Sequence, residues 1–202
     1  MVKYISQLLF VTLSCLTVGC SVFSPVKLRP QSTYLLDTTP NAISTKHKGV
    51  AVLLVADPES SATYNTSKMA YSVRPFQVAY FSENKWAQAP AAMLSPLMVE
   101  TLQETKRYHA VITPGVSTRY DYVLHTQLTE LQQDFTVTPA VVRLTVSAEL
   151  MSVNTRRVLA AKQFAVIESM RYKTPDSGVY AANRAVVRFL QQLRTFCLTN
   201  SL

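Results

Sequence analysis

The chain has 202 residues, of which 48% are hydrophobic and 16% are charged, with a formal net charge of +8. This composition is that of an ordinary globular protein, and no apolar stretch after Val18 is long enough to span a membrane. No run of consecutive lysines or arginines marks a nucleic-acid-binding stripe. The composition therefore excludes a polytopic membrane protein and argues against a nucleic-acid partner.

The N-terminus has the organisation of a bacterial lipoprotein signal. Lys3 supplies a positive n-region, and Ile5 to Val18 form an apolar core that is too short to cross a bilayer. A small residue, Gly19, precedes Cys20. We therefore predict a signal peptide at 1–19 and a lipid anchor of the palmitate type on Cys20; an ordinary secretory signal or an uncleaved anchor is the alternative. Because Ser21, and not aspartate, follows the cysteine, we expect the outer membrane, facing the periplasm.

Removing residues 1–19 leaves 183 of the 202 residues, which corresponds to one domain. We expect a lipidated N-terminus and tether at 20–32 and a single domain at 33–202. A flexible tether of this length reaches about 20 Å on average. The formal charge of +8 falls to about +7 without Lys3. In the envelope this positive charge could bind lipid headgroups, lipopolysaccharide or acidic protein surfaces; alternatively, it serves solubility alone.

Hydrophobic periodicity predicts a β-rich domain with two amphipathic helices. The apolar run at 50–56 is typical of a strand buried on both faces. The strand candidates are 33–37, 50–56, 69–73, 76–81, 108–113, 122–135, 140–150 and 157–167; the helix candidates are 90–106 and 179–198; and a loop at 57–68 and turns at 82–85 and 154–155 connect them. The expected fold class is α/β, in the α+β sense: a mixed β-sheet covered by two amphipathic helices.

Three local features refine this prediction. The apolar residues of 122–135 change parity, which predicts a β-bulge near Thr129-Glu130. Pro96 requires either a helix start capped by Ser95 or a kinked helix. Cys197 lies on the apolar stripe of the last helix and has no cysteine partner once Cys15 is removed and Cys20 is acylated, so we expect a buried thiol.

No catalytic, metal or cofactor motif stands out in the chain. The glycines of the mature chain are isolated, so none forms a phosphate-binding loop. His47, His109 and His125 lack metal-ligand spacing, and His125 has the parity of an exposed strand residue. We therefore expect a protein that is not an enzyme and that holds no cofactor or metal.

One group of aromatic residues is unusual for its density: Tyr71, Phe76, Tyr80, Phe81 and Trp86. The group could be a lipid- or protein-contact surface. Alternatively, it could form the core side of a hairpin beneath a helix, which is the more common role of such a group.

Several short segments in a fixed order resemble a known family. The segments are Cys20, Tyr34-Leu35-Leu36, Tyr80-Phe81, Trp86-Ala87-Gln88-Ala89-Pro90, Asp121-Tyr122 with Leu124, Arg157-Val158-Leu159-Ala160-Ala161 with Phe164, and Ala181-Ala182-Asn183-Arg184-Ala185. In this order the chain resembles the ABC-type transport auxiliary lipoproteins, the accessory lipoproteins of Mce-type (paraquat-inducible) intermembrane transport systems. The polar loop at 57–68 does not contribute to the match.

The resemblance implies a domain similar to the N-terminal domain of TolB and a role without catalysis. It implies an outer-membrane lipoprotein that docks to a periplasmic Mce-domain subunit, alongside a permease and an ATPase, and helps lipids move between the inner and outer membranes. We assign the expected docking surface to the aromatic group, and a homo-oligomer is possible. The alternatives are a structural or regulatory lipoprotein, such as an activator of a peptidoglycan synthase, and a lipid-binding protein that acts alone.

Overall fold

The computed structural model describes residues 30–43, 49–116 and 118–201. The predicted signal peptide, Cys20 and most of the predicted tether lie outside the described residues. Gln31–Leu202 form one compact unit. Its elements are β1 (Ser32–Tyr34), β2 (Val52–Val55), β3 (Glu59–Ser60), β4 (Lys68–Ser72), β5 (Ala79–Trp86), α2 (Pro90–Gln103), β6 (Ala110–Ile112), β7 (Tyr122–Asp134), β8 (Val141–Ser152), β9 (Arg157–Ser169) and α3 (Pro175–Asn200).

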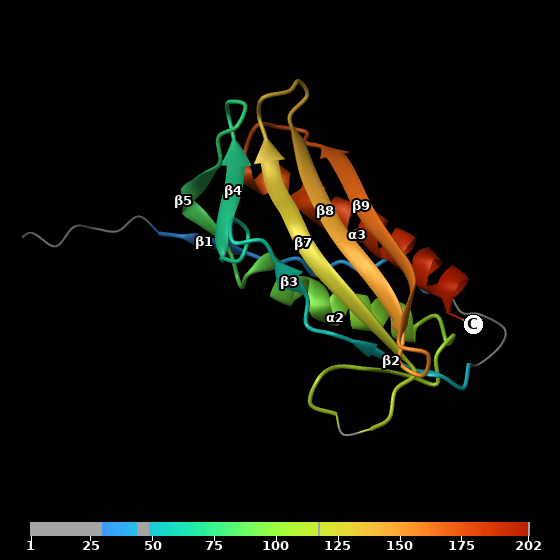
Figure 1. Ribbon diagram of the computed structural model, residues 1–202. Coiled ribbons are helices and arrows are strands. Elements are labelled where there is room, and N and C mark those ends of the chain that lie inside the picture. Colours follow the sequence, from blue (N-terminus) through green and yellow to red (C-terminus); the bar gives the residue numbers. More distant parts are fainter. Residues whose placement is uncertain (1–29, 44–48, 117, 202) are drawn as a thin grey trace, which may run out of the picture. The chain divides into compact units, whose positions relative to one another are not determined.

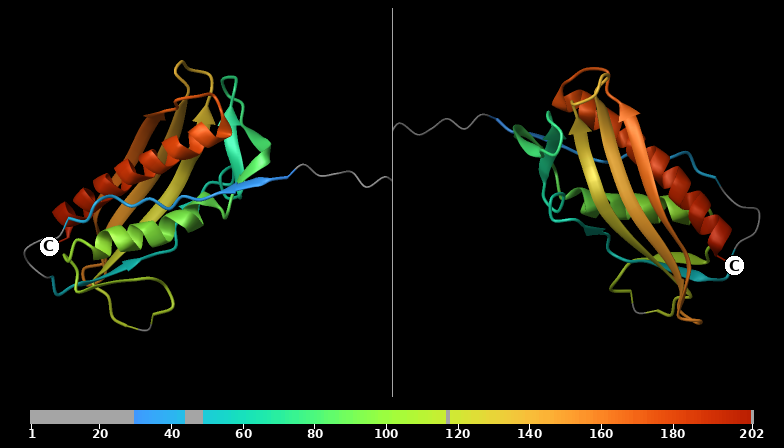
Figure 2. Two further views of the ribbon diagram at one scale, coloured as in Figure 1. Left: turned by 180° about the vertical axis from the view of Figure 1, so that it is seen from behind. Right: turned by 45° about the horizontal axis from the view of Figure 1, so that its top comes forward.

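All the described strands belong to one mixed sheet that is organised around β7 (Figure 1). Along one side, β7 pairs in parallel with β2, β3 and β4. Along the other side, β7 starts an antiparallel meander with β8 and β9. Both helices lie against the same face of the sheet, so the opposite face of β7–β9 is left uncovered (Figure 2). The predicted mixed sheet with two covering helices is confirmed.

The long antiparallel strands follow the predicted patterning closely. The register of β7 against β8 shifts between Leu128 and Glu130, which confirms the predicted bulge. In β8 the buried residues alternate with half-exposed ones from Val142 to Leu150. The buried residues of β8 and β9 meet α3, where Phe164 lies edge-on to Phe189 with ring centroids 5.6 Å apart. Cys197 is fully buried in this layer, as predicted.

Both helices begin at proline residues. In α3, Thr174 caps the N-terminus by accepting a hydrogen bond from the backbone of Ser177, Pro175 follows, and Asp176 complements the helix dipole. The predicted start at Val179 was therefore too late. In α2, Pro90 lies at the start, as predicted, and Pro96 lies inside the helix. Of the two alternatives for Pro96, the helix start capped by Ser95 is therefore wrong.

The hairpin of β4 and β5 differs from the prediction. Its turn lies at 73–78, and β5 continues through the polar residues at 82–85 that were predicted to form a turn. Those residues are strand because β1 pairs with them, for example Ser32 with Asn84. The predicted loop at 57–68 contains the two-residue strand β3. In β2 only Leu53 and Val55 are fully buried, so the expectation of burial on both faces is met on one face alone.

Candidate functional site

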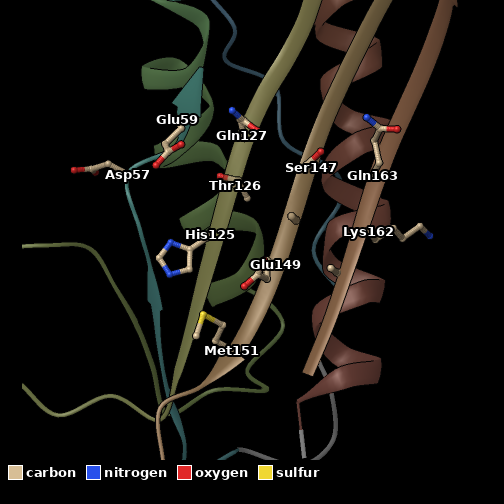
Figure 3. A pocket seen from close by; sticks show the side chains of 12 residues that line it. Asp57, Glu59, His125, Thr126, Gln127, Ser147, Glu149, Met151, Lys162 and Gln163 are labelled. Atoms are coloured by element: carbon tan, nitrogen blue, oxygen red, sulfur yellow. The ribbon is translucent and has the colours of Figure 1, made fainter. Parts of the chain in front are cut away.

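The uncovered face of the sheet carries a shallow hollow of about 640 Å³, which is the candidate functional site (Figure 3). It spans β7, β8 and β9, together with the segment that follows β2. The lining residues are Asp57, Glu59, His125, Thr126, Gln127, Ser147, Ala148, Glu149, Met151, Ala161, Lys162 and Gln163. We call this surface the open face.

Strand register arranges polar residues across the open face in rows. One row is His125, Glu149 and Ala161, and the next is Gln127, Ser147 and Gln163. Neighbours within a row have Cβ atoms about 5 Å apart, so the strands fix the spacing of these polar groups. Ala161 and Ser147 have small side chains, so the surface of the hollow lies close to the strands there. The result is a broad, rigid and hydrophilic surface.

The charges around the hollow are mainly negative. Glu59 lies beside Gln127 through the pairing of β3 with β7, and Asp57 precedes it in the same segment. Glu149 adds a third carboxylate from β8. The Lys162 side chain points away from these carboxylates (Figure 3), and its ammonium group lies 5.2 Å from the centroid of the Phe164 ring. The open face therefore suits partners that present hydrogen-bond donors or positive charge.

The open face places a serine, a histidine and a carboxylate close together without coupling them. Ser147 lies opposite Gln127, whereas His125 lies opposite Glu149. Ser147 and His125 are thus diagonal neighbours, about 7–8 Å apart at their backbones. Within the part of the chain that the structure describes, no hydrogen bond joins the two side chains. This spacing does not polarise the hydroxyl group in the way that nucleophilic catalysis needs.

The aromatic group predicted as a docking surface is divided between core and solvent. Trp86 is buried, with 3% of its surface exposed, whereas Phe76 is fully exposed in the turn at 73–78. Tyr71 and Phe81 stack with ring centroids 4.3 Å apart and are half-buried. Tyr80 donates a hydrogen bond to the carbonyl oxygen of Thr63. The five residues therefore do not form one continuous surface.

The remaining candidates for chemistry are inert or dispersed. Burial raises the pKa of the Cys197 thiol to about 12. His109 and His125 are both exposed, but His109 directly precedes β6 and His125 lies on β7. His47 lies outside the described residues. Among the described residues, no group of three or more His, Cys, Asp or Glu side chains could hold a metal ion. None of the described helices combines the length and the apolar character that crossing a membrane requires.

Comparison with known proteins identifies the family. The family model of the ABC-type transport auxiliary lipoprotein component matches residues 34–193. The chain belongs to this family. The matched range begins at the last residue of β1 and ends in α3, so in this ABC-type transport auxiliary lipoprotein the match includes every described strand from β2 to β9. The resemblance inferred from the short sequence segments is thereby confirmed. Among curated proteins, none matches the chain.

Two solved structures share the fold of this auxiliary lipoprotein. Protein XCC0632 from Xanthomonas campestris is 19% identical, with a TM-score of 0.69, and the match covers 85% of this chain and 94% of that one. The structure of an uncharacterized protein is 12% identical, with a TM-score of 0.68, and covers 83% of this chain and 99% of that one. At these identities the likeness shows the fold alone.

Sequence reasoning identified single residues of the open face but not the face itself. The alternation of β8 marked Ser147 and Glu149 as outward, and parity marked His125 as exposed. The hollow exists because β3, β7, β8 and β9 lie side by side and both helices cover the other face. Strand order and helix placement depend on long-range pairing, which local periodicity does not report.

Proposed function

We propose that this protein is a non-catalytic accessory lipoprotein of an Mce-type ABC transport system. In this proposal, cleavage leaves Cys20 as an acylated N-terminus in the outer membrane, and the folded unit docks to the periplasmic Mce-domain subunit. The permease and the ATPase of the same system drive lipid movement between the inner and outer membranes. The observation that carries the proposal is the family match over residues 34–193.

The open face is the docking surface that we assign to this partner. Its carboxylates, Asp57, Glu59 and Glu149, would repel an anionic membrane and favour a protein surface with basic or donor groups. Its polar side chains project from long paired strands, which hold them in fixed positions. The outer edge of β9 has no pairing strand among the described residues, and it adjoins the open face. This edge therefore either extends the docking surface or pairs with a strand of a second copy of this chain.

Site-specific photo-crosslinking in native membranes tests the proposal. A photoreactive amino acid replaces Gln127 or Gln163 on the open face, and adducts are identified after irradiation. Tyr80 is the matched position for the aromatic alternative, since its side chain lies on the β4–β5 hairpin. Tyr180, which is 73% exposed on α3, serves as the control on the helical side.

We expect adducts with an Mce-domain protein from Gln127 and Gln163, and none from Tyr180. Adducts from Tyr80 alone would move the docking surface to the aromatic hairpin while keeping the partner. Recovery of a peptidoglycan synthase instead would favour the regulatory role and reject the transport role. A lipid-binding protein acting alone would give no protein adduct and would retain lipid through purification.

A further inference from the structure

Three connecting segments meet at one end of the sheet. The last paired row across the central strands consists of Ser72, Asp134, Val141 and Ser169. Directly beyond this row come residues 73–78, 135–140 and 170–174, which we call the loop end. Figure 1 shows these segments side by side at the top of the sheet. Adjacent strands lie about 4.8 Å apart, so the loop end is a single compact surface.

The loop end combines exposed apolar side chains with positive charge. Its exposed large apolar and aromatic residues are Val73 (52%), Phe76 (109%), Val78 (42%), Val137 (37%) and Tyr172 (60%). Its charged residues are Arg74, Arg171 and Lys173, all exposed, and the three segments contain no carboxylate. Apolar groups mixed with cations and interfacial tyrosine are the composition that binds an anionic membrane surface.

Phe76 carries two unfavourable features at the tip of this surface. Its side chain is fully exposed, and its backbone φ of 63° lies in the left-handed region. A bulky residue is rare in that region, where glycine or asparagine would avoid the steric cost. A strained residue that also exposes an aromatic ring to water indicates a contact that is absent from the isolated chain.

The loop end is held in place by packing and hydrogen bonds. Phe135, the first residue of the second segment, lies edge-on to the stacked pair of Tyr71 and Phe81, at centroid distances of 6.1 and 6.4 Å. The Ser72 hydroxyl group donates a hydrogen bond to the carbonyl oxygen of Arg74 at 2.8 Å. These contacts present the exposed residues on a preformed surface, which lowers the entropic cost of binding.

The carboxylates nearest to the loop end are already engaged. Asp134 pairs with Arg143 at 2.8 Å. Glu168 pairs with two arginines of α3 at 3.2 and 2.7 Å. Asp176 accepts a hydrogen bond from the hydroxyl group of Tyr34. The positive charges of Arg74, Arg171 and Lys173 therefore act on the surroundings without a competing free carboxylate within the loop end.

We propose that the loop end binds the anionic phospholipid surface of the membrane that holds the Cys20 anchor. The length of the chain outside the described unit allows this contact. Residues 20–31 span at most about 40 Å, and Ser32 lies opposite Asn84, about 17 Å along β5 from Ala79 at the loop end. This geometric step rests on the acylation in the proposed function. The bound sheet stands on its end and keeps the open face free.

Vesicle flotation of the unacylated mature chain tests the proposal. The chain begins at residue 20 and carries Cys20→Ser, so that no acyl group contributes to membrane affinity, and the loop-end variants separate the folded unit from the tether. The vesicles contain either phosphatidylcholine alone or phosphatidylcholine with phosphatidylglycerol. We expect flotation with the anionic vesicles only. Phe76→Ser should weaken the partition coefficient about tenfold, and removing two charges by Arg171→Gln with Lys173→Gln should weaken it about thirtyfold.

Matched variants at the opposite end of the sheet control for charge and hydrophobicity. Arg156→Gln with Arg157→Gln removes the same charge from the β8–β9 turn and the first residue of β9, and Val158→Ser removes an exposed apolar group beside them. These variants should bind nearly as well as the parent chain. Loss of binding in the controls but not in the loop-end variants would overturn the proposal. Absence of flotation with anionic vesicles would also overturn it and would leave the loop end to a protein partner.

The test is independent of the docking proposal. No acyl group and no transport subunit is present in the flotation experiment, so a negative result would not bear on crosslinking through the open face. Conversely, a failed crosslink to an Mce-domain protein would leave the vesicle result unchanged. Thermal unfolding of each variant verifies that the folded unit is intact.

Discussion

Gly178 at the start of α3 faces the side chain of Gln133 in β7. A methyl group added at Gly178 would stand 2.0 Å from Cδ of Gln133. That side chain is 3% exposed, and its Nε2 donates hydrogen bonds to Met69 Sδ and to the carbonyl oxygen of Pro175, each at 3.2 Å. The absence of a side chain at residue 178 therefore sets how closely α3 approaches the sheet.

Gly178→Ala should destabilise the protein by about 1–3 kcal/mol, because the buried Gln133 amide would have to shift away from its hydrogen-bond partners, Met69 and Pro175. In an unrestricted helix, Gly→Ala raises stability, so the effect expected here has the opposite sign. Urea unfolding measures the change. In a double-mutant cycle with Gln133→Ala, the two effects should be less than additive. Full additivity would show that the close approach is not the cause.

Cys197 should be unreactive toward thiol reagents in the folded protein. Burial raises the pKa of its thiol to about 12, so the thiolate is scarce at ordinary pH and is not accessible. Labelling with a maleimide should therefore require global unfolding. Its rate should increase with denaturant concentration as the unfolded fraction increases. In this measurement Cys20→Ser removes the second thiol of the mature chain. Rapid labelling in native buffer would contradict the burial.

Protonation of Asp134 should lower the stability of the folded protein in acid. Burial alone would raise its pKa, but hydrogen bonds from Thr136 and Arg143 lower the pKa below its ordinary value of 3.8. A lowered pKa stabilises the folded state above the unfolded-state pKa, and this stabilisation is lost as the pH falls through the folded-state pKa.

Asp134→Asn tests this dependence. At neutral pH the variant should be less stable than the parent by about 1–3 kcal/mol, since the amide keeps one oxygen for Thr136 but Arg143 loses its charged acceptor. The difference should narrow as the pH falls below about 4. Denaturant unfolding at a series of pH values measures it, and a constant difference across the series would argue against the assigned cause.

The aromatic group should separate into stabilising and neutral members. Trp86→Ala should cost about 3–5 kcal/mol because it empties a buried site. Phe76→Ala should change stability by less than about 0.5 kcal/mol because its ring contacts solvent. Thermal unfolding of the two variants distinguishes them. Equal destabilisation would mean that the turn at 73–78 packs against the core.

Local patterns in the sequence predicted features that depend on neighbouring residues. The parity change around Leu128 predicted the bulge, and the helical stripe ending at Cys197 predicted the buried face of α3. Both signals arise within one element, so they do not depend on its partners. The polar residues at 82–85 were misread as a turn, because the strand they form is completed by β1, about fifty residues earlier in the chain.

The candidate site was harder to predict for the same reason. His125 and Glu149 face each other across two strands, and sequence periodicity marks each as exposed without relating them. The loop end joins segments that are separated by many residues, and only the register of four strands brings them together. Exposure of Phe76 follows from a turn whose position depends on where β4 and β5 stop pairing.

The central position of β7 has a consequence for when the sheet can form during synthesis. Among the described strands, β7 joins the group β1–β5–β4 to the pair β2–β6, and α3 packs mainly on β8 and β9, which follow it in the chain. The two groups cannot join into one sheet until the chain has been synthesised through Asp134. Under the proposed function, a precursor engaged by the secretion machinery soon after synthesis begins would not yet have its complete sheet. Threading through a narrow translocation channel would then require little mechanical unfolding, and the domain would complete its fold after export.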